Sequence, residues 1–457
     1  MAMAEPVRPE SPKTIVAILA ERLVSWVWES GVLRGSPNAG RTHLKRTLPK
    51  PVLAVYCLLL CAACLGDGSD PAAMDHAVAL DLFAAWPGDQ SFRLAAEPSL
   101  VVGLDESLPL GGTWAPGAVF FGDGIAIADA QSDEVLILDG AGRLLSRHGR
   151  NGDGPGEYRF LAGIARHADG LLTWDANHFR LTQLDASGGY VGETSLRGRR
   201  GGSRIVGAFG NSVLFEFWRR GFPGDGSVGP MEIRLPVTYE IVRLSDGEIV
   251  FEGTRPGEEQ WAAREVTDDG QRDGGLPVIF GRTAVAAVTD NYAYLATTDS
   301  LTITRYDEAG TTGEVAFEQP QERAEAGWER FVRDTTRASI ESIEPGQIFL
   351  GGRNFMMSIR EFRLGLIDDL PARPTLPPFS AMKGGADGLL WIREYPDPLQ
   401  DEVVWVGFNE AWERKKRLAM PARLSVLNVL DISEDRVLVW AKGAHDENLV
   451  EVYPIER

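Results

Sequence analysis

The sequence predicts an all-β fold built from repeated antiparallel sheets, and two observations support this prediction. Gly124–Asp129 and Gly170–Asp175 are short apolar runs that each begin at a glycine and end at an aspartate. The residues around them recur at one step of 46, from Asp129 to Asp175, from Asp139 to Asp185 and from Gly142 to Gly188. A fixed period of about 40–50 residues made of short strands and turns is typical of a β-propeller. The sequence therefore predicts that architecture.

Each of the two copies has a simple mechanical interpretation. The apolar run alternates with a period of two, which buries one face of a strand, and the aspartate with its polar neighbours forms a turn. A second apolar strand follows, and Gly142 or Gly188 then stands where a tight turn with positive φ prefers glycine. Residues 143–146 and 190–193 supply a fourth, outer strand.

Four weaker copies follow in the rest of the chain. Their strand pairs are residues 211–217 with 240–244, 291–297 with 301–307, 388–393 with 403–409, and 435–440 with 449–453. Innermost strands are expected at residues 164–166, 205–209, 284–288, 382–386 and 427–432. The prediction is six blades of four antiparallel strands. Because a propeller must close its ring to remove sheet edges, we expect residues 99–104 to complete the last blade.

The second copy carries a family resemblance. Residues 153–158 read Asp-Gly-Pro-Gly-Glu-Tyr, and residues 174–181 read Trp-Asp-Ala-Asn-His-Phe-Arg-Leu. This resembles the repeat of NHL-type six-bladed propellers, with a glycine-rich loop, a strand ending in aspartate and an Asn-His-Arg turn, which Phe179 interrupts here. The resemblance extends over most of residues 99–457 and implies the fold. Since NHL-type propellers include protein-binding, RNA-binding and lyase members, it leaves the function open.

The N-terminal part predicts export. A basic stretch at 41–46 precedes an apolar run at 51–64 that is too short to span a bilayer but suits the core of a signal peptide. The run ends Leu-Cys-Ala-Ala-Cys, which resembles a bacterial lipobox with Cys64 as the lipidated residue, although Cys61 replaces the usual aliphatic residue. All three cysteines (Cys57, Cys61 and Cys64) lie in this run, so the mature chain is expected to have no disulfide. The alternatives are an uncleaved anchor or a buried strand in a cytosolic protein.

These features divide the chain into three parts. Residues 1–63 are an N-terminal extension and lipoprotein signal peptide, in which residues 1–43 suggest an over-extended gene start. Residues 64–98 are expected to be a tether, because 67–88 are rich in Gly, Asp, Pro and Ala. Residues 99–457 form the predicted propeller, with a small helical insertion where 319–344 has the spacing of an amphipathic helix.

Charge and topology narrow the expected function. A net charge of −19 over 457 residues argues against nucleic-acid binding, which needs phosphate neutralisation by Lys and Arg. In a four-stranded blade, the link between the second and third strands and the link to the next blade lie on one face. The long segments all fall on that face, namely residues 149–156, 197–204, 218–236, 253–280, 319–378 and 394–402. The other face receives short turns such as 245–247 and 307–310, so we expect function on the loop-rich face.

The loop-rich face holds the candidate binding residues. They are arginines and one tryptophan, and comprise Arg197, Arg199, Arg200, Arg204, Trp218, Arg219 and Arg220. Arginine forks suit a carboxylate or phosphate, and a tryptophan can stack on a sugar or another planar group. The alternative interpretation is a solvated basic loop that pairs with surrounding acidic residues.

Signals for catalysis are few. The glycine-rich residues 152–156 lack the Lys-Ser/Thr of a phosphate-binding loop, and neither a His-Glu-x-x-His nor a serine-elbow motif is present. Asp129 and Asp175 could ligate a metal, but at the end of a strand a turn-capping role suffices. His167 and Asp431 could reach the central channel. We therefore predict no catalytic residue, metal or cofactor, and a lipid-anchored module that binds a protein or glycan. The arginines suit an anionic ligand of either kind. The alternative is a metal-dependent hydrolase or lyase with its site in the channel.

Overall fold

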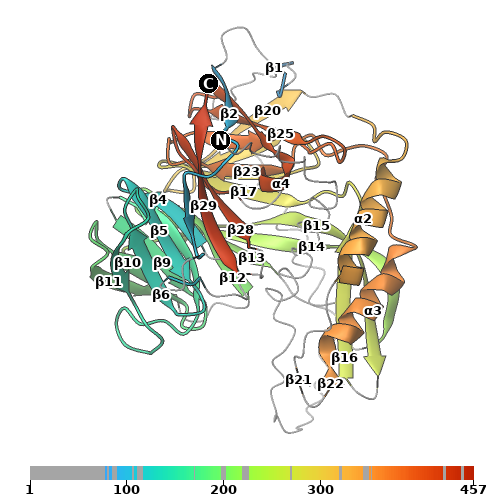
Figure 1. The fold of residues 1–457 in the computed structure, drawn as a ribbon, viewed down its shortest axis with the longest axis horizontal. Coiled ribbons are helices and arrows are strands. Elements are labelled where there is room, and N and C mark those ends of the chain that lie inside the picture. The colour runs from blue at the N-terminus through green and yellow to red at the C-terminus, as the bar shows by residue number, and fades with distance from the viewer. Residues whose placement is uncertain are drawn as a thin grey trace, which may run out of the picture.

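The computed structural model describes residues 78–79, 82–84, 90–104, 108–110, 117–168, 170–196, 202–218, 226–267, 270–318, 322–342, 349–350, 353–425, 429–443 and 447–457. Most of these residues lie in strands, and the strands form several separate sheets (Figure 1). Two helices, α2 and α3, lie together beside β16, on the side of the molecule away from the sheets of β4–β11 (Figure 1). The fold is therefore mainly β, as predicted.

The first two sheets contain the two clear sequence copies. The first sheet has β4 (Gly117–Phe121), β5 (Gly124–Asp129), β6 (Glu134–Leu138) and β7 (Leu144–His148) in antiparallel order. The second sheet has β8 (Leu161–His167), β9 (Gly170–Asp175), β10 (Arg180–Leu184) and β11 (Tyr190–Ser195) in the same order. The strands expected from the repeat are present in both copies.

The repeated glycines have two distinct physical causes. At Gly124 and Gly170 a Cβ atom would strike the carbonyl oxygen of Leu138 and Leu184, respectively, so only glycine lets the third strand end this close to the second. Gly142 and Gly188 instead have φ values of 78° and 83°, the left-handed conformation that favours glycine in a tight turn. Each position in the repeat therefore has its own reason for glycine.

The third sheet is enlarged. It contains β12 (Gly202–Phe209), β13 (Ser212–Trp218), β14 (Val228–Arg243), β15 (Ile249–Thr267) and β16 (Gly270–Pro277). The last pair between β13 and β14 is Trp218 with Val237, so residues 228–236 of β14 run on past β13. There they pair with residues 256–264 of β15, which in turn pairs with β16. We call residues 228–236, 256–267 and β16 the extension.

Three further sheets each gain a strand from the N-terminal region. The fourth sheet, β17 (Ala284–Val288), β18 (Ala293–Thr297), β19 (Thr302–Tyr306) and β20 (Thr312–Glu318), takes β1 (Val78–Ala79) in parallel. The fifth, β23 (Ala381–Gly384), β24 (Leu390–Arg393), β25 (Glu402–Phe408) and β26 (Arg414–Pro421), takes β2 (Gln90–Leu94) in parallel. The sixth, β27 (Val429–Ile432), β28 (Arg436–Lys442) and β29 (Asn448–Glu456), takes β3 (Leu100–Val102) antiparallel to β29. Strand β2 also pairs with β29 and so joins the fifth and sixth sheets.

The first strands of these sheets contact one another in cyclic order. Strand β4 contacts β8, β8 contacts β12, β12 contacts β17, β17 contacts β23, β23 contacts β27, and β27 contacts β4. Small residues permit this close approach, since a Cβ at Gly163 would lie 2.6 Å from the Ile205 side chain and one at Gly207 would lie 2.7 Å from that of Val288. These first strands therefore surround a common axis in a propeller-like arrangement.

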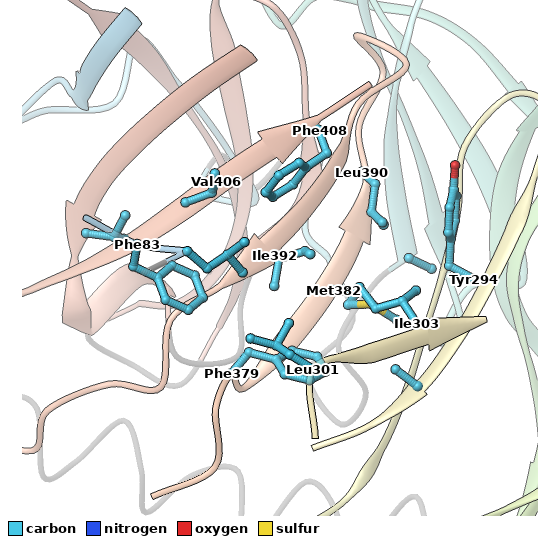
Figure 2. Packing of buried hydrophobic residues seen from close by; sticks show 14 residues of the cluster. Phe83, Tyr294, Leu301, Ile303, Phe379, Met382, Leu390, Ile392, Val406 and Phe408 are labelled. Atoms are coloured by element: carbon cyan, nitrogen blue, oxygen red, sulfur yellow. The ribbon is translucent and has the colours of Figure 1, made fainter. Parts of the chain in front are cut away.

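The hydrophobic core lies between neighbouring sheets. Figure 2 shows one cluster between the fourth and fifth sheets, where Tyr294 and Ile303 meet Met382, Ile392 and Phe408. Burying each of these large side chains contributes about 1.5–3 kcal/mol, so the sheets are held together mainly by this packing.

Leu82 and Phe83 join the same cluster from the N-terminal region. This differs from the tether expected at residues 64–98. The described parts of that segment (β1, residues 82–84 and residues 90–98, which include β2) pair with strands or pack on the sheets. Three apolar residues, Leu82, Phe83 and Leu94, explain the difference because each is buried. The remainder of the segment lies outside the described residues.

The helices form a layer against the extension. α2 (Trp328–Ser342) contacts α3 (Phe355–Ile367), α3 contacts β16, and the short strands β21 (Phe349–Leu350) and β22 (Arg353–Asn354) lie between the two helices in the chain. A separate core unites them, in which Trp328, Ile340 and Ile367 pack with Leu276 and Phe280. We call residues 322–342, 349–350 and 353–378 the insertion. α4 (Ala422–Ser425) is a single turn next to β26. Within the described residues, none of these helices combines the length and hydropathy needed to cross a bilayer.

Candidate functional site

Of the predicted binding residues, the structure describes Arg204 and Trp218. Arg204 lies near the start of β12 and pairs in register with Glu216, while Trp218 ends β13. The Arg204 guanidinium donates to the Glu216 carboxylate at 3.0 Å and lies 6.0 Å from the centre of the Trp218 ring. Its side chain is 56% exposed. The structure therefore brings this arginine and tryptophan together at a strand end, where they are accessible to a ligand.

The other predicted site residues lie outside the described residues. They are Arg197, Arg199, Arg200, Arg219, Arg220 and the predicted lipidation residue Cys64. In sequence, Arg199 and Arg200 precede β12, and Arg219 and Arg220 follow β13. Their role stays a prediction.

The extension projects from the same end of the third sheet as Arg204 and Trp218. It continues β14 and β15 beyond the Trp218–Val237 pair, and the insertion packs against it. The described parts of residues 218–236 and 253–280, which were expected as long loops, are therefore largely strand. The sequence did not indicate this because β14 has exposed or half-buried residues along most of its outer half, and so lacks the alternation of a strand with one buried face.

A network of charged side chains ties the extension to the insertion. The Glu259 carboxylate of β15 accepts hydrogen bonds from the Arg373 side chain and the Arg282 amide, both at 3.0 Å. Arg373 also pairs with Glu232 at 2.7 Å. Burial raises the pKa of Glu259, but these two hydrogen bonds and the charges of Arg373 and Arg234 outweigh it, so the pKa is lowered overall. The network fixes the insertion against the extension.

The glycine-rich loop at residues 149–156 is held by local contacts. Asp153 accepts bonds from Arg159 at 2.6 Å and from His178 at 2.9 Å, and the hydrogen bonds from these two side chains lower its pKa. The Glu157 carboxylate accepts the Gly154 amide at 2.9 Å. The polar groups of the loop therefore bond within the loop and to residues next to the second sheet.

The two strand-end aspartates cap turns. Asp175 is fully buried and accepts the amides of Arg159, Asn177 and His178 at 2.8–3.0 Å. Asp129 accepts the Gln131 amide at 3.1 Å. Among the described residues, no group of three or more His, Cys, Asp or Glu side chains is placed to hold a metal ion.

Asp431 is a buried carboxylate on one of the first strands that surround the common axis. It lies on β27 and is 1% exposed. It accepts the Phe120 amide of β4 and the Ile432 amide, both at 2.9 Å, and pairs with the Arg166 guanidinium of β8. Burial raises its pKa, and the Arg166 and Lys383 charges and the two amides offset part of that rise. One carboxylate therefore connects the first, second and sixth sheets.

Lys383 lies on β23, next to β27, and its side chain is half-buried. Burial lowers the pKa of this lysine to about 8. The Asp431 carboxylate opposes the shift, whereas the Arg204 and Arg166 charges add to it. Asp431 was predicted to reach the channel, whereas Arg166 and Lys383 were not identified. The sequence signal that could have identified Arg166 and Lys383 is a charged residue within a first strand whose other residues are mostly apolar.

His167, the other residue predicted for the channel, lies next to Arg166 at the end of β8. Its Nε2 atom is 3.2 Å from the Gly210 carbonyl oxygen, at an exposed position. The ring therefore contacts the hairpin of the next sheet, while Arg166 is the β8 residue that reaches Asp431.

Comparisons with known proteins give fold-level likeness only. No protein-family model matches the chain, and no curated protein matches it in sequence. A candidate exported protein of Bacteroides fragilis aligns over 80% of this chain and 98% of its own, with 9% identity and a TM-score of 0.36. A DUF4221 member of Bacteroides vulgatus covers 80% of this chain and 99% of its own, with 9% identity and a TM-score of 0.41. For virginiamycin B lyase of Staphylococcus aureus the coverages are 75% and 95%, the identity 10% and the TM-score 0.32. At these values the likenesses assign no activity.

Proposed function

We propose that the chain is a six-bladed β-propeller of the NHL type whose last blade is completed by the N-terminal strand. The cyclic contacts among β4, β8, β12, β17, β23 and β27 support six blades. The antiparallel pairing of β3 with β29, in which Val102 faces Val450, supports completion of the sixth sheet by the N-terminal region. A covered edge is favourable because an unpaired edge strand is a template for aggregation.

The chain is exported and anchored through a lipid on Cys64 in this proposal. The basic flank, the short apolar core and the terminal cysteine at residues 41–64 support it. Palmitate labelling of the wild type, of Cys64→Ser and of the control Cys57→Ser tests it. We expect label in the wild type and Cys57→Ser only. Equal labelling of all three, or of none, would contradict the anchor.

The propeller acts as a non-catalytic binding module for an anionic protein or glycan. The main supporting observation is that Arg204 and Trp218 lie together at the end of the third sheet from which the extension projects. A guanidinium fork recognises a carboxylate, sulfate or phosphate, and the adjacent indole offers a flat apolar surface to a sugar ring. In sequence, the arginines at 197, 199 and 200 precede β12, and those at 219 and 220 follow β13.

Affinity electrophoresis in gels containing dextran sulfate tests this function, with neutral dextran as the reference polymer. Replacing both contact groups, in Arg204→Glu/Trp218→Ala, should weaken retardation by dextran sulfate about tenfold, since 1.4 kcal/mol of lost contact is tenfold in affinity. The control is Arg147→Glu, because Arg147 makes a similar exposed ion pair, with Glu134 at 2.9 Å, on the outer strand β7. Equal retardation of all three proteins would contradict the proposed face.

A metal-dependent hydrolase or lyase is the competing function. Its site would lie at the common axis, where Asp431 is placed. Turnover of lactone or ester substrates that requires a divalent ion and is abolished by a chelator would favour this function over binding alone.

A further inference from the structure

An N-terminal segment adds to the outside of the fourth and fifth sheets. We call its described parts, which are β1, residues 82–84 and β2, the strap. β1 pairs in parallel with the outer strand β20 through residues 78 and 79. β2 pairs in parallel with the outer strand β26 through residues 90–93, and its last two residues also pair with β29. The strap therefore covers the edges of sheets that later segments of the chain build.

Two apolar side chains anchor the strap. Leu82 and Phe83 are 2% and 5% exposed and belong to the cluster that joins the fourth and fifth sheets. Figure 2 shows the Phe83 ring at one end of that cluster, away from Tyr294. The Arg414 side chain donates to the Leu82 carbonyl at 2.9 Å, and the Arg417 side chain donates to the Phe83 carbonyl at 3.4 Å. Edge pairing combined with buried side chains is how an extended peptide binds to a sheet.

The ring of first strands is formed without the strap. The cyclic contacts involve β4, β8, β12, β17, β23 and β27, and the sixth sheet has β3 paired with β29. Residues 96–99, which link the strap to β3, are exposed or half-buried. Departure of the strap is therefore a local opening that leaves the ring contacts in place.

The surface beneath the strap needs a cover. We call this surface, which is formed by β20, β26 and the cluster around Leu82 and Phe83, the strap site. Without a strap it would present unpaired backbone groups and exposed apolar side chains, and both favour association. The strap of another copy has the matching sequence, because an exchanged strap makes the same contacts as the original one.

We propose that the strap exchanges between two copies of the chain, so that the strap site of each copy binds the strap of the other. The partner is therefore a second copy of this chain, and residues 96–99 are the hinge. The strap site lies on the fourth and fifth sheets, whereas Arg204 and Trp218 lie on the third. Different variants therefore test this interaction and the proposed binding function.

Size-exclusion chromatography of the full chain with light scattering tests the exchange. We expect a dimer whose fraction rises with protein concentration and which separates slowly on dilution, because a strap must leave one site before it returns to the other. Phe83→Asp buries a charge in the strap site and should weaken the dimer about tenfold or more. Ser91→Asp is the matched control, since Ser91 is an exposed residue of β2, and this variant should dimerise as the wild type does.

Two results of this experiment would overturn the proposal. One is a wild type that stays monomeric at every concentration. The other is a dimer that persists equally in Phe83→Asp, which would show that the copies meet through another surface.

A fluorescent peptide with the sequence of residues 78–94 provides the second test, by anisotropy with the full chain. The binding rate should reach a plateau as the peptide concentration rises, because the chain's own strap must leave first. The full-length Phe83→Asp variant, whose own strap binds weakly, should bind this peptide more tightly than the wild type does, which also shows that the variant is folded.

Two altered peptides are the controls. The peptide with Phe83→Asp should bind about tenfold more weakly or worse, and the peptide with Ser91→Asp should bind as the parent peptide does. Equal binding of all three peptides, or no binding of the parent peptide to either protein, would contradict a strap site that accepts a second copy.

Discussion

The second sheet and the third sheet are built from neighbouring units of the same chain, yet they differ in strand length and in what they carry. In the second sheet, β8–β11 are short. The turn capped by Asp175 and the glycine turns limit the length of these strands. In the third sheet, β14 and β15 have 16 and 19 residues and carry an extension with its own core. Where the sequence repeat is kept, the residues form only the sheet and its turns. Where the repeat is lost, the residues form the extension, which projects beyond β13.

The largest expected effect compares one tryptophan from each region. Trp174 of β9 is fully buried, and its ring centre lies 4.8 Å from that of Phe215 in the third sheet. We expect Trp174→Ala to lower the free energy of unfolding by about 3–5 kcal/mol, because it leaves a large cavity between two sheets. Urea unfolding followed by circular dichroism measures this loss.

Trp328→Ala is the matched change in the insertion, where Trp328 begins α2 and is 7% exposed. The insertion has a separate core, so we expect faster hydrogen exchange in α2, α3 and β16 and little change in β4–β11. If hydrogen exchange in β4–β11 rises equally, the core of the insertion and the cores between the sheets unfold as one unit. That outcome would contradict a separate core in the insertion.

A smaller loss is expected from the buried cap of the second sheet. Asp175→Ala leaves the Arg159, Asn177 and His178 amides without their acceptor, of which the Arg159 amide bonds at 2.8 Å. The expected cost is about 1–3 kcal/mol, from buried donors left unsatisfied. Thermal unfolding of Asp175→Ala beside Asp175→Asn, which keeps one acceptor oxygen, separates the hydrogen bonds from the charge. A larger loss in Asn than in Ala would contradict the capping role.

The smallest expected effect concerns acid and the insertion. The folded-state pKa of Glu259 is lowered, so its contribution to stability is fully present above its unfolded value near 4.5 and is lost as the pH falls through the folded value. Because its pairs are partly exposed, the contribution should be below about 1 kcal/mol.

The measurement is urea unfolding of the wild type and Glu259→Gln at pH 6 and at pH 3.5. The wild type should be the more stable at pH 6, and the difference should shrink at pH 3.5. Glu402→Gln, which removes an exposed carboxylate that pairs with Arg93 at 3.6 Å, is the control and should show little difference at either pH. A difference for Glu259→Gln that grows toward pH 3.5 would contradict the sign of the pKa shift.

The sequence predicted the strands best where local chemistry alone determines them. The bounds of β5 and β9 match the expected runs, because the glycine at one end and the aspartate cap at the other leave little freedom. The helix at residues 319–344 was also expected, and α2 buries Trp328 and Ile340 from that stretch. A repeat period, an aspartate cap and the apolar face of a helix can all be recognised from residues that are close in sequence.

The features that sequence missed depend on distant partners. β14 and β15 stabilise each other outside the ring, so neither shows a one-sided apolar pattern. β2 is polar along most of its length and is a strand because β26 and β29 offer their edges. Arg166 meets Asp431 across 265 residues of chain. None of these relations is local in sequence.

The pairing of β3 with β29 has a consequence for the time course of synthesis. The Ser99 hydroxyl donates to the Val452 carbonyl across 353 residues of chain. The Phe120 amide donates to the Asp431 carboxylate across 311 residues. While the chain emerges, β3 has no partner strand and the first sheet lacks its contact with β27. Because such distant contacts form late and expose unpaired edges meanwhile, a chain released before its last strand would carry β3 uncovered. We therefore expect the pairing of β3 with β29 to be a late step in folding.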